Sequence, residues 1–292
     1  MSTLYVSDLD GTLLNDEQRI NPLSVQLLNA LIGRGLNFTI ATARSYESTR
    51  ALLEGLNLKL PGVFMNGVFT TELGTGRPLE SHFLDNGLGR EIVSLYAGEG
   101  LNPVVYTIDR QGSPRVYYRG VFNPSEEHYF GARLKHESDR FRRIDAFDAC
   151  LDEQLIAVNA IEVPERLEAV YGELSKRVGC VCHYGPDIYA PGYHWLEVSS
   201  DLATKRQGVE RLKERFGFEK LVCFGDNLND LSMFGAADEC YAVENAHEAV
   251  KLAATGVIGG NDDDGVARFI AEHAGKNGLG GIAIWLPEKA KE

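Results

Sequence analysis

The sequence has few basic residues for its length. Lys and Arg number 29 against 42 Asp and Glu, which gives a formal net charge of −13 over 292 residues. Nonspecific binding to nucleic acid or to an anionic membrane needs a basic surface, so we expect neither partner. Attraction for a phosphate group must then come from a small, local set of cations.

The chain also lacks a long apolar run. No stretch approaches the roughly 20 residues that a membrane-spanning helix needs, and the N-terminal Leu4-Tyr5-Val6 is typical of a strand rather than a signal sequence. We therefore expect a cytoplasmic protein. With 44% hydrophobic and 24% charged residues, the chain is of globular type and long enough for two moderate domains.

Cysteines are few, and their spacing excludes a zinc site. Cys180 and Cys182 stand two residues apart on a predicted strand, where both sulfurs share one face. Because free cysteine behaves as a small buried hydrophobe, we expect reduced, packed thiols rather than a metal or redox site. The five are Cys150, Cys180, Cys182, Cys223 and Cys240.

What the sequence does have is a pair of carboxylates directly after an apolar strand. Asp8 and Asp10 follow Leu4-Tyr5-Val6 at alternating positions, and Gly11 lets the backbone turn away. Oxygen ligands of this kind suit Mg²⁺, and one carboxylate could attack a phosphoryl group while the other moves a proton. Taken alone, the pattern is equally compatible with a surface turn.

A second apolar strand, Leu221-Val222-Cys223-Phe224, also runs into acids, at Asp226 and Asp230. In parallel α/β sheets, functional groups collect beyond the carboxyl ends of the strands, so both acidic segments could hold one divalent ion. Between them the sequence has Thr42 at the end of another strand, and Lys205 in Ala203-Thr204-Lys205-Arg206. A hydroxyl and a cation are the groups that a phosphate site needs.

These residues occur in the order of four motifs, and the chain resembles the haloacid dehalogenase superfamily of phosphohydrolases over residues 4–271. The four segments are Asp8-Leu9-Asp10-Gly11-Thr12, Thr42-Ala43-Arg44, Lys205, and Gly225-Asp226-Asn227-Leu228-Asn229-Asp230. Met65-Asn66-Gly67, Asp264-Gly265-Val266-Ala267 and the wide gap before Lys205 are similar to the Cof-type branch, subfamily IIB with a C2-type cap.

The resemblance implies a role for each catalytic residue. Asp8 would be the nucleophile that becomes an aspartyl-phosphate, and Asp10 would protonate the leaving alcohol and later activate water. Thr42 and Lys205 would bind the transferring phosphoryl group. The cation would offset the repulsion between an anionic nucleophile and an anionic phosphate.

The resemblance also implies a Mg²⁺ site. Its ligands would be the Asp8 carboxylate, the Asp10 backbone carbonyl and Asp226, with Asp230 supporting the ion. Further candidates for contacts with phosphate or substrate are Leu9, Ala43, Arg44, Asn66, Asn229, His183, Asp187 and Tyr189.

Two departures from the family pattern bear on the site. Ala43 stands where glycine is usual, which adds a methyl group that we expect to be tolerated. Arg206 follows Lys205 where glycine is common; Lys213 and Lys220 are less well placed alternatives, one within a helix and one just before a strand.

Each candidate also has a simpler structural interpretation. Thr42 could cap a helix N-terminus, and Asp230 could cap the helix of residues 231–234. Lys205 could be a surface lysine, and Arg44 is more typical of an ion-pair partner than of a catalyst. Polar and aromatic residues cluster before Glu197 and could read the leaving group or simply pack; they are His183, Tyr184, Asp187, Tyr189, His194 and Trp195.

The alternation of strands and helices predicts an α/β fold with a doubly wound parallel, Rossmann-like sheet. We assign residues 1–83 and 191–292 to this core and residues 84–190 to an inserted α+β cap that selects the substrate. Predicted core helices include 22–34, 46–56, 208–216, 230–236 and 246–254. The tail 275–292 is expected to pack as a terminal extension, with an edge strand or a subunit contact as alternatives.

The sequence therefore predicts a Mg²⁺-dependent phosphatase of small phosphorylated metabolites, with sugar phosphates ahead of pyridoxal phosphate and flavin mononucleotide. A phosphomutase, which returns the phosphoryl group to a sugar, is the nearest alternative. A carbon–phosphorus hydrolase ranks lower because Lys135 and Lys176 have no special setting. A metabolite-binding regulator without turnover is the alternative from another class. We expect a monomer or a small homo-oligomer.

Overall fold

The computed structural model describes residues 2–136, 139–187 and 190–275. It divides into two compact units, each of which contains more than one stretch of the chain. Unit 1 consists of residues 1–64, 71–78 and 208–292, and unit 2 of residues 65–70 and 79–207. The domain boundaries drawn from the sequence stay a prediction.

Unit 1 is built on a parallel five-stranded sheet with the order β14-β13-β12-β1-β2. Its strands are short and nearly all apolar, as expected for strands with both faces buried. This confirms the predicted α/β class. The strands are β1 (Thr3–Ser7), β2 (Asn37–Ile40), β12 (Lys220–Gly225), β13 (Glu239–Val243) and β14 (Gly256–Ile258).

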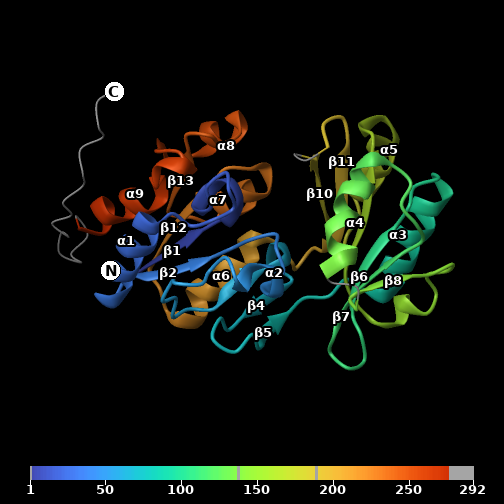
Figure 1. Cartoon of the computed structure of the whole chain (residues 1–292), viewed down its shortest axis with the longest axis horizontal. Coiled ribbons are helices and arrows are strands. Elements are labelled where there is room, and N and C mark those ends of the chain that lie inside the picture. The colour runs from blue at the N-terminus through green and yellow to red at the C-terminus, as the bar shows by residue number, and fades with distance from the viewer. Residues whose placement is uncertain (1, 137–138, 188–189, 276–292) are drawn as a thin grey trace. The chain divides into compact units, whose positions relative to one another are not determined.

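Within the described residues, six helices connect or flank these strands, and α1 packs beside α9 (Figure 1). One predicted helix, 46–56, is too long: α2 ends at Arg50, and the following N–H groups of Leu52 and Glu54 bond to carbonyls only three residues back. The helices are α1 (Pro22–Gly33), α2 (Tyr46–Arg50), α6 (Lys205–Phe216), α7 (Leu231–Phe234), α8 (Glu248–Ala253) and α9 (Gly265–Ala274). Helix α6 begins at the end of unit 2 and continues into unit 1.

The order of strands reverses direction around β1. From β1 the chain proceeds to β2 on one side, whereas β12, β13 and β14 follow on the other side. Ligands of open α/β sheets bind beyond the carboxyl ends of the strands at such a switch point. Two short turns leave these ends: η1 (Leu9–Leu13) after β1 and η4 (Leu228–Asp230) after β12.

Unit 2 has a six-stranded sheet with the order β10-β11-β9-β6-β7-β8, antiparallel except for the β7–β8 pair. Its helices are α3 (Asn86–Gly98), α4 (Pro124–His136) and α5 (Pro164–Leu174), with a short turn η3 (Cys150–Asp152). The strands are β6 (Val104–Ile108), β7 (Pro114–Tyr118), β8 (Phe141–Arg143), β9 (Gln154–Glu162), β10 (Cys180–Pro186) and β11 (His194–Ser200).

Each face of this sheet supports its own apolar cluster. One contains Leu196 and Val198 of β11 with residues of α3 and α5, and the other contains Trp195 with residues of α4. Cys180 and Cys182 both belong to the first cluster, which confirms that their side chains share a face, and all five cysteines are free thiols.

Three short strands, β3 (Gly62–Phe64), β4 (Phe69–Thr71) and β5 (Pro78–Ser81), form a separate small sheet in that order, and the turn η2 (Met65–Gly67) stands between the first two. Among the described residues, no helix is both long and apolar enough to cross a membrane. Residues 276–292, and with them the expectation for the tail, lie outside the described part of the chain.

Candidate active site

Three carboxylates from two adjacent strand ends meet in unit 1. Asp8 follows β1, and Asp226 and Asp230 follow β12; one oxygen of each lies within 4.8 Å of the other two. Asp8 is 5% exposed and Asp230 is fully buried. Carboxylate oxygens are the ligands that Mg²⁺ prefers, and buried anions this close repel each other unless a cation compensates them. The donor set therefore fits a divalent ion.

Hydrogen bonds hold two of these carboxylates in position. Thr12 donates its hydroxyl to Asp226 Oδ1 at 2.8 Å. Asp230 Oδ2 accepts from the backbone N–H groups of Asp226 and Asn227, both at 3.0 Å, within a capping box of the η4 turn. Asp230 makes no side-chain cap of helix α7, so that simpler interpretation is wrong.

Gly11 permits the close approach between the two acidic segments. Its φ is +70°, and a Cβ atom at this position would lie 2.5 Å from Asp226 Oδ2. Any other residue would be strained in this conformation and would displace the Asp226 carboxylate.

Asp10 has a different partner from the other carboxylates. Arg44 binds it in a bidentate ion pair, with Nε 2.7 Å from Oδ2 and Nη2 2.6 Å from Oδ1. Arg44 Nη2 also donates to Gln18 at 3.2 Å. The interpretation of Arg44 as an ion-pair partner is therefore confirmed, and its partner is the predicted acid and base.

Thr42 is fully buried two residues after the end of β2, where its backbone N–H donates to the Val63 carbonyl. Its hydroxyl oxygen accepts from the Arg44 N–H at 3.1 Å. The N-cap of α2 is Ser45, so the alternative that Thr42 caps this helix is wrong.

The neighbouring candidates of unit 1 differ in exposure. Ala43 is exposed, as expected for a tolerated methyl group, whereas Leu9 is fully buried inside the η1 turn. Asn229 lies in the η4 turn, and its carbonyl accepts from the Ser232 hydroxyl at 3.2 Å.

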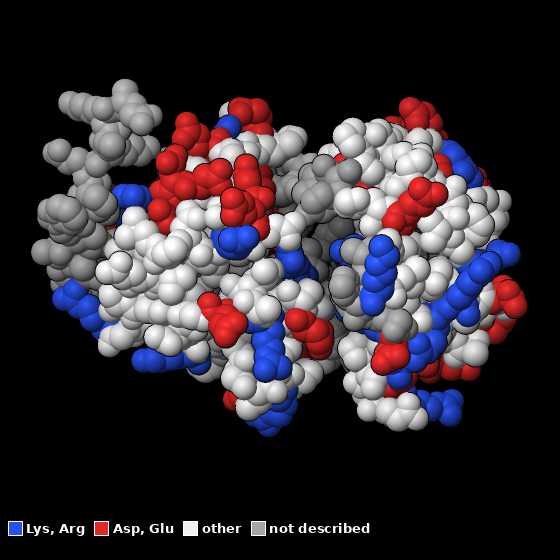
Figure 2. All heavy atoms as spheres, in the orientation of Figure 1, with Lys and Arg blue, Asp and Glu red and all other residues white. Residues whose placement is uncertain are grey.

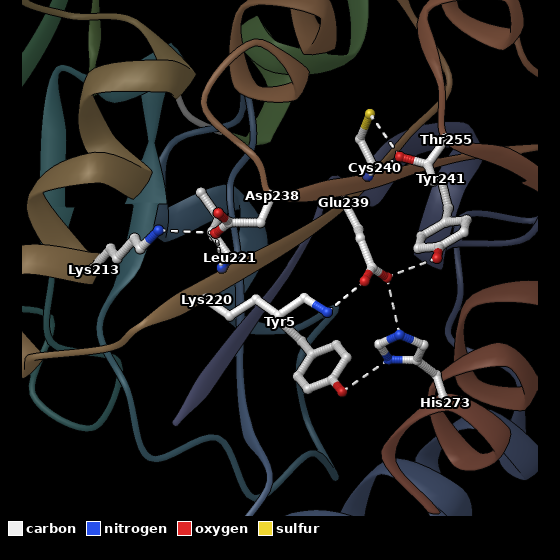
Figure 3. Close-up of polar contacts among 10 residues, drawn as sticks. All are labelled: Tyr5, Lys213, Lys220, Leu221, Asp238, Glu239, Cys240, Tyr241, Thr255 and His273. Atoms are coloured by element: carbon white, nitrogen blue, oxygen red, sulfur yellow. Dashed lines mark hydrogen bonds and ion pairs between the residues drawn. The ribbon is translucent and has the colours of Figure 1, made fainter. Parts of the chain in front are cut away.

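Lys205 is the first residue of α6 and belongs to unit 2, where it is 1% exposed. Burial of this kind is unusual for lysine and argues against a simple surface role. The two alternative lysines are engaged elsewhere: Lys213 pairs with Asp238 at 2.8 Å, and Lys220 pairs with Glu239 (Figure 3). Both pairs stand at the amino ends of β12 and β13, away from the acidic turns.

Two candidates of unit 2 lie around Glu197. Asn66 donates to Glu197 Oε1 at 3.3 Å, and His183 is the direct cross-strand neighbour of Glu197 in the β10–β11 ladder. Burial, and then the charge of Lys205, lowers the pKa of His183 to about 4. Burial raises the pKa of Glu197, partly opposed by the hydrogen bond from Asn66. His183 is therefore neutral at physiological pH.

The remaining residues of the predicted cluster do not form one group, although Tyr184 and His194 pack together with ring centroids 5.2 Å apart. Tyr184 stacks on Tyr171, with ring centroids 4.7 Å apart, on one face of the sheet, whereas Trp195 contacts Tyr129 at 5.1 Å on the other. Asp187 is buried and accepts from the Ser125 hydroxyl. Tyr189 lies outside the described residues. The expectation of one cluster overlooked the alternation of side chains along a strand.

Sequence reasoning missed the contacts of Thr12 and Glu197. Thr12 stands inside the first motif, and a hydroxyl four residues after Asp8 was the available signal. Glu197 stands within an otherwise apolar stretch, Trp195–Val198, where a single acid is itself a signal of a buried polar contact.

Comparison with known proteins gives one family for nearly the whole chain. The model of the haloacid dehalogenase-like hydrolases matches residues 5–270. Two relatives align end to end. The 5-amino-6-(5-phospho-D-ribitylamino)uracil phosphatase YitU of Bacillus subtilis is 27% identical over 92% of this chain and 97% of its own. The pyridoxal phosphate phosphatase YbhA of Escherichia coli is 25% identical over 94% of this chain and 99% of its own.

Solved structures share the fold. TM0651 from Thermotoga maritima has a TM-score of 0.72 and 26% identity, covering 93% of this chain and 97% of its own. The subclass IIB sugar phosphatase BT4131 has a TM-score of 0.71 and 20% identity, and the match covers 94% of this chain and 99% of its own. The second likeness concerns the fold alone.

Proposed function

Since the chain belongs to the haloacid dehalogenase-like hydrolase family and is a phosphatase, we propose that it hydrolyses small phosphorylated metabolites with the help of Mg²⁺. The observation that carries the proposal is the meeting of Asp8, Asp226 and Asp230 within 4.8 Å beyond two adjacent parallel strands. Sugar phosphates are the proposed substrate class.

In this mechanism Asp8 attacks the phosphorus atom and forms an aspartyl-phosphate, while the bond to the leaving oxygen breaks. Asp10 gives its proton to that oxygen and then takes a proton from the water that cleaves the aspartyl-phosphate. Arg44 fixes the direction of the Asp10 carboxylate through its two hydrogen bonds. Thr42 and Lys205 are proposed to hold the phosphoryl oxygens.

Asp8, Asp226 and the Asp10 carbonyl are proposed as ligands of the ion, with Asp230 behind them. When bound, Mg²⁺ would neutralise charge on the transferring group. Figure 2 shows acidic side chains gathered over the part of unit 1 where Figure 1 has α7 and α8. In such surroundings an anionic substrate depends on local positive charge to reach Asp8.

Relatives differ in what they act on. YitU is named for a phosphorylated ribitylaminouracil, and YbhA for pyridoxal phosphate. Both substrates are small phosphate monoesters, which supports small phosphorylated metabolites as the substrate class. Sugar phosphates, pyridoxal phosphate and flavin mononucleotide are therefore compared in one test. Cytoplasmic location and oligomeric state stay predictions.

The test is phosphate release from a panel of sugar phosphates, nucleotides, pyridoxal phosphate and flavin mononucleotide, with Mg²⁺ and with chelator. We expect release that depends on Mg²⁺ and is greatest with one group of sugar phosphates. Sugar-phosphate isomers that appear without free phosphate would instead indicate a mutase. Binding without turnover of any substrate would indicate a regulator.

Asp8→Asn tests the nucleophile within the same assay. The amide keeps the shape of the side chain but cannot form the aspartyl-phosphate, so turnover should fall by roughly 10⁴-fold or more. Thermal unfolding should change little, which separates lost chemistry from lost fold. A variant that keeps most of its activity would refute the mechanism.

A further inference from the structure

One short segment of unit 1 contacts both acidic turns of the candidate site. Residues 244–247 follow β13, the strand next to β12. Asn245 donates its side-chain amide to the Gly11 carbonyl at 2.7 Å, and the His247 N–H donates to the Asp226 carbonyl at 2.8 Å. A third strand end therefore joins the two that carry the carboxylates.

Asn245 is itself held from the other side. Its Oδ1 accepts from the backbone N–H of Asn261 at 3.1 Å. The side chain of Asn261 donates to the Leu14 carbonyl at 3.1 Å and to Asp16 Oδ1 at 3.0 Å. Asn261, which is 6% exposed, thus reaches the end of the η1 turn directly and Gly11 through Asn245.

The contact at Gly11 bears on a proposed metal ligand. Gly11 and Thr12 share a peptide group, so a hydrogen bond that fixes the Gly11 carbonyl also fixes the backbone of Thr12. Thr12 in turn donates to Asp226 Oδ1 at 2.8 Å. The connection runs from Asn245 through one peptide plane and one hydroxyl to the carboxylate.

From these contacts we infer that Asn245 is a positioning residue for the phosphatase reaction, acting through Gly11 and Thr12 on Asp226; the inference rests on the proposed function. Asn245 lies at the surface and its hydrogen bond to Gly11 is solvent-exposed, so its contribution to folding is small. Its main effect is on the geometry of the acidic group. Outer partners of this kind typically change metal affinity or activity by about 10–100-fold when removed.

The chain supplies a matched control in Asn29. Asn29 also donates its amide to a backbone carbonyl, that of Gly55 at 2.7 Å, and accepts from the backbone N–H of Asn57 at 2.7 Å. Both bonds are solvent-exposed, as is the bond from Asn245 to Gly11, and neither involves a residue of the site. Asn29→Ala therefore removes the same kind of bridge without touching the acidic turns.

The experiment compares Asn245→Ala and Asn29→Ala in phosphate release and in thermal unfolding with increasing Mg²⁺. Asn245→Ala should lower kcat by about 10–100-fold with little change in KM, and should need more Mg²⁺ for the same rise in Tm. Asn29→Ala should keep the kcat and the Mg²⁺ response of the wild type. Asn245→Asp keeps the acceptor for Asn261 but loses the donor, so it should match Asn245→Ala.

Equal kcat values and equal Mg²⁺ responses in Asn245→Ala and Asn29→Ala would overturn the inference. So would a loss of kcat in both variants that follows their loss of Tm. If the wild type releases no phosphate at all, the proposed function fails; a Mg²⁺-dependent rise in Tm that weakens only in Asn245→Ala would still support the effect on Asp226.

Discussion

The two units keep their buried polar side chains in different parts of the strand. In unit 1, Asp8 and Asp226 come directly after the last residues of parallel strands. In unit 2, His183, Glu197 and Asn159 stand in the middle of three neighbouring antiparallel strands and are register partners of one another. One unit thus gathers polar groups at strand ends, and the other in a row across the sheet.

The difference follows from how each sheet is covered. A parallel sheet buried on both faces has no polar face along its strands, so charges collect where the backbone turns. There, backbone N–H groups and hydroxyls such as that of Thr12 can orient them. In unit 2, Asn159 Oδ1 and His183 Nε2 are buried and find no hydrogen-bond partner within the described residues. Burial is the main cause of the lowered pKa of His183.

The tight fit of the strand ends in unit 1 predicts the largest effect among the comparisons between the two units. Gly11→Ala should reduce kcat by at least about 10³-fold, which corresponds to about 4 kcal/mol, because the added Cβ would displace the Asp226 carboxylate. The measurement is phosphate release with Mg²⁺ present. The matched change in unit 2 is Gly172→Ala on α5, where nothing lies within 4 Å of the new methyl group.

Gly172→Ala should leave kcat unchanged and stabilise the protein by roughly 0.5–1 kcal/mol, since alanine is the better helix former. If Gly11→Ala retains wild-type turnover, the acidic turns are more adaptable than their packing indicates, and the contrast between the units weakens.

Next comes a pH effect on the stability of unit 2. Glu126 is 1% exposed and accepts from the Phe122 N–H at 2.6 Å, and burial raises its pKa from 4.5 to about 7. A raised pKa means that the folded state binds the proton of Glu126 more tightly than the unfolded state does. The contribution of this bound proton to the free energy of unfolding is therefore complete below pH 4.5, and it is lost as the pH rises through about 7.

Glu126→Gln cannot ionise and keeps an acceptor for Phe122. Its stability should equal that of the wild type near pH 4 and exceed it at pH 8 by up to about 2 kcal/mol, after allowance for residual solvation. Thermal unfolding across this pH range measures the difference. If the difference in stability between the variant and the wild type is the same at every pH, the pKa of Glu126 does not change on folding and the prediction is wrong.

The smallest effect is expected for the ion pair of Asp10. Arg44→Lys keeps the charge but cannot donate two parallel hydrogen bonds, so Asp10 loses its fixed direction and kcat should fall about tenfold. Arg115→Lys makes the same change in unit 2, where Arg115 pairs with Asp109 at 2.8 Å, and should leave kcat as it is. Equal effects of the two changes would remove any special role for Arg44.

Much of unit 1 could be predicted because its signals are local. The apolar strands ending at Ser7 and Gly225, with acids after them, stand in consecutive residues, and so does helix α1 behind Pro22. The end of α2 at Arg50 could not be predicted, because the apolar spacing continues through Leu53 and Leu56 while the backbone tightens into turns.

The contacts among polar and aromatic side chains of unit 2 were harder to predict because the residues that meet are far apart in the sequence. Tyr184 and Trp195 look like members of one group along the chain, yet alternation sends them to opposite faces. The partnership of Asn66 with Glu197 joins residues 131 positions apart. Such pairs depend on the register between strands, which no short segment specifies.

By itself the sequence determined the family, the parallel α/β core and the identity of the acids, since each is written in a short stretch where an apolar strand meets polar residues. Only the tertiary structure decided which partner each acid has. Arg44 binds Asp10, Thr12 binds Asp226, and Asn245 reaches Gly11 from a segment more than 200 residues away in the sequence. Hydrogen bonds require atoms about 3 Å apart, and only the packing of the strands and turns sets distances of that size.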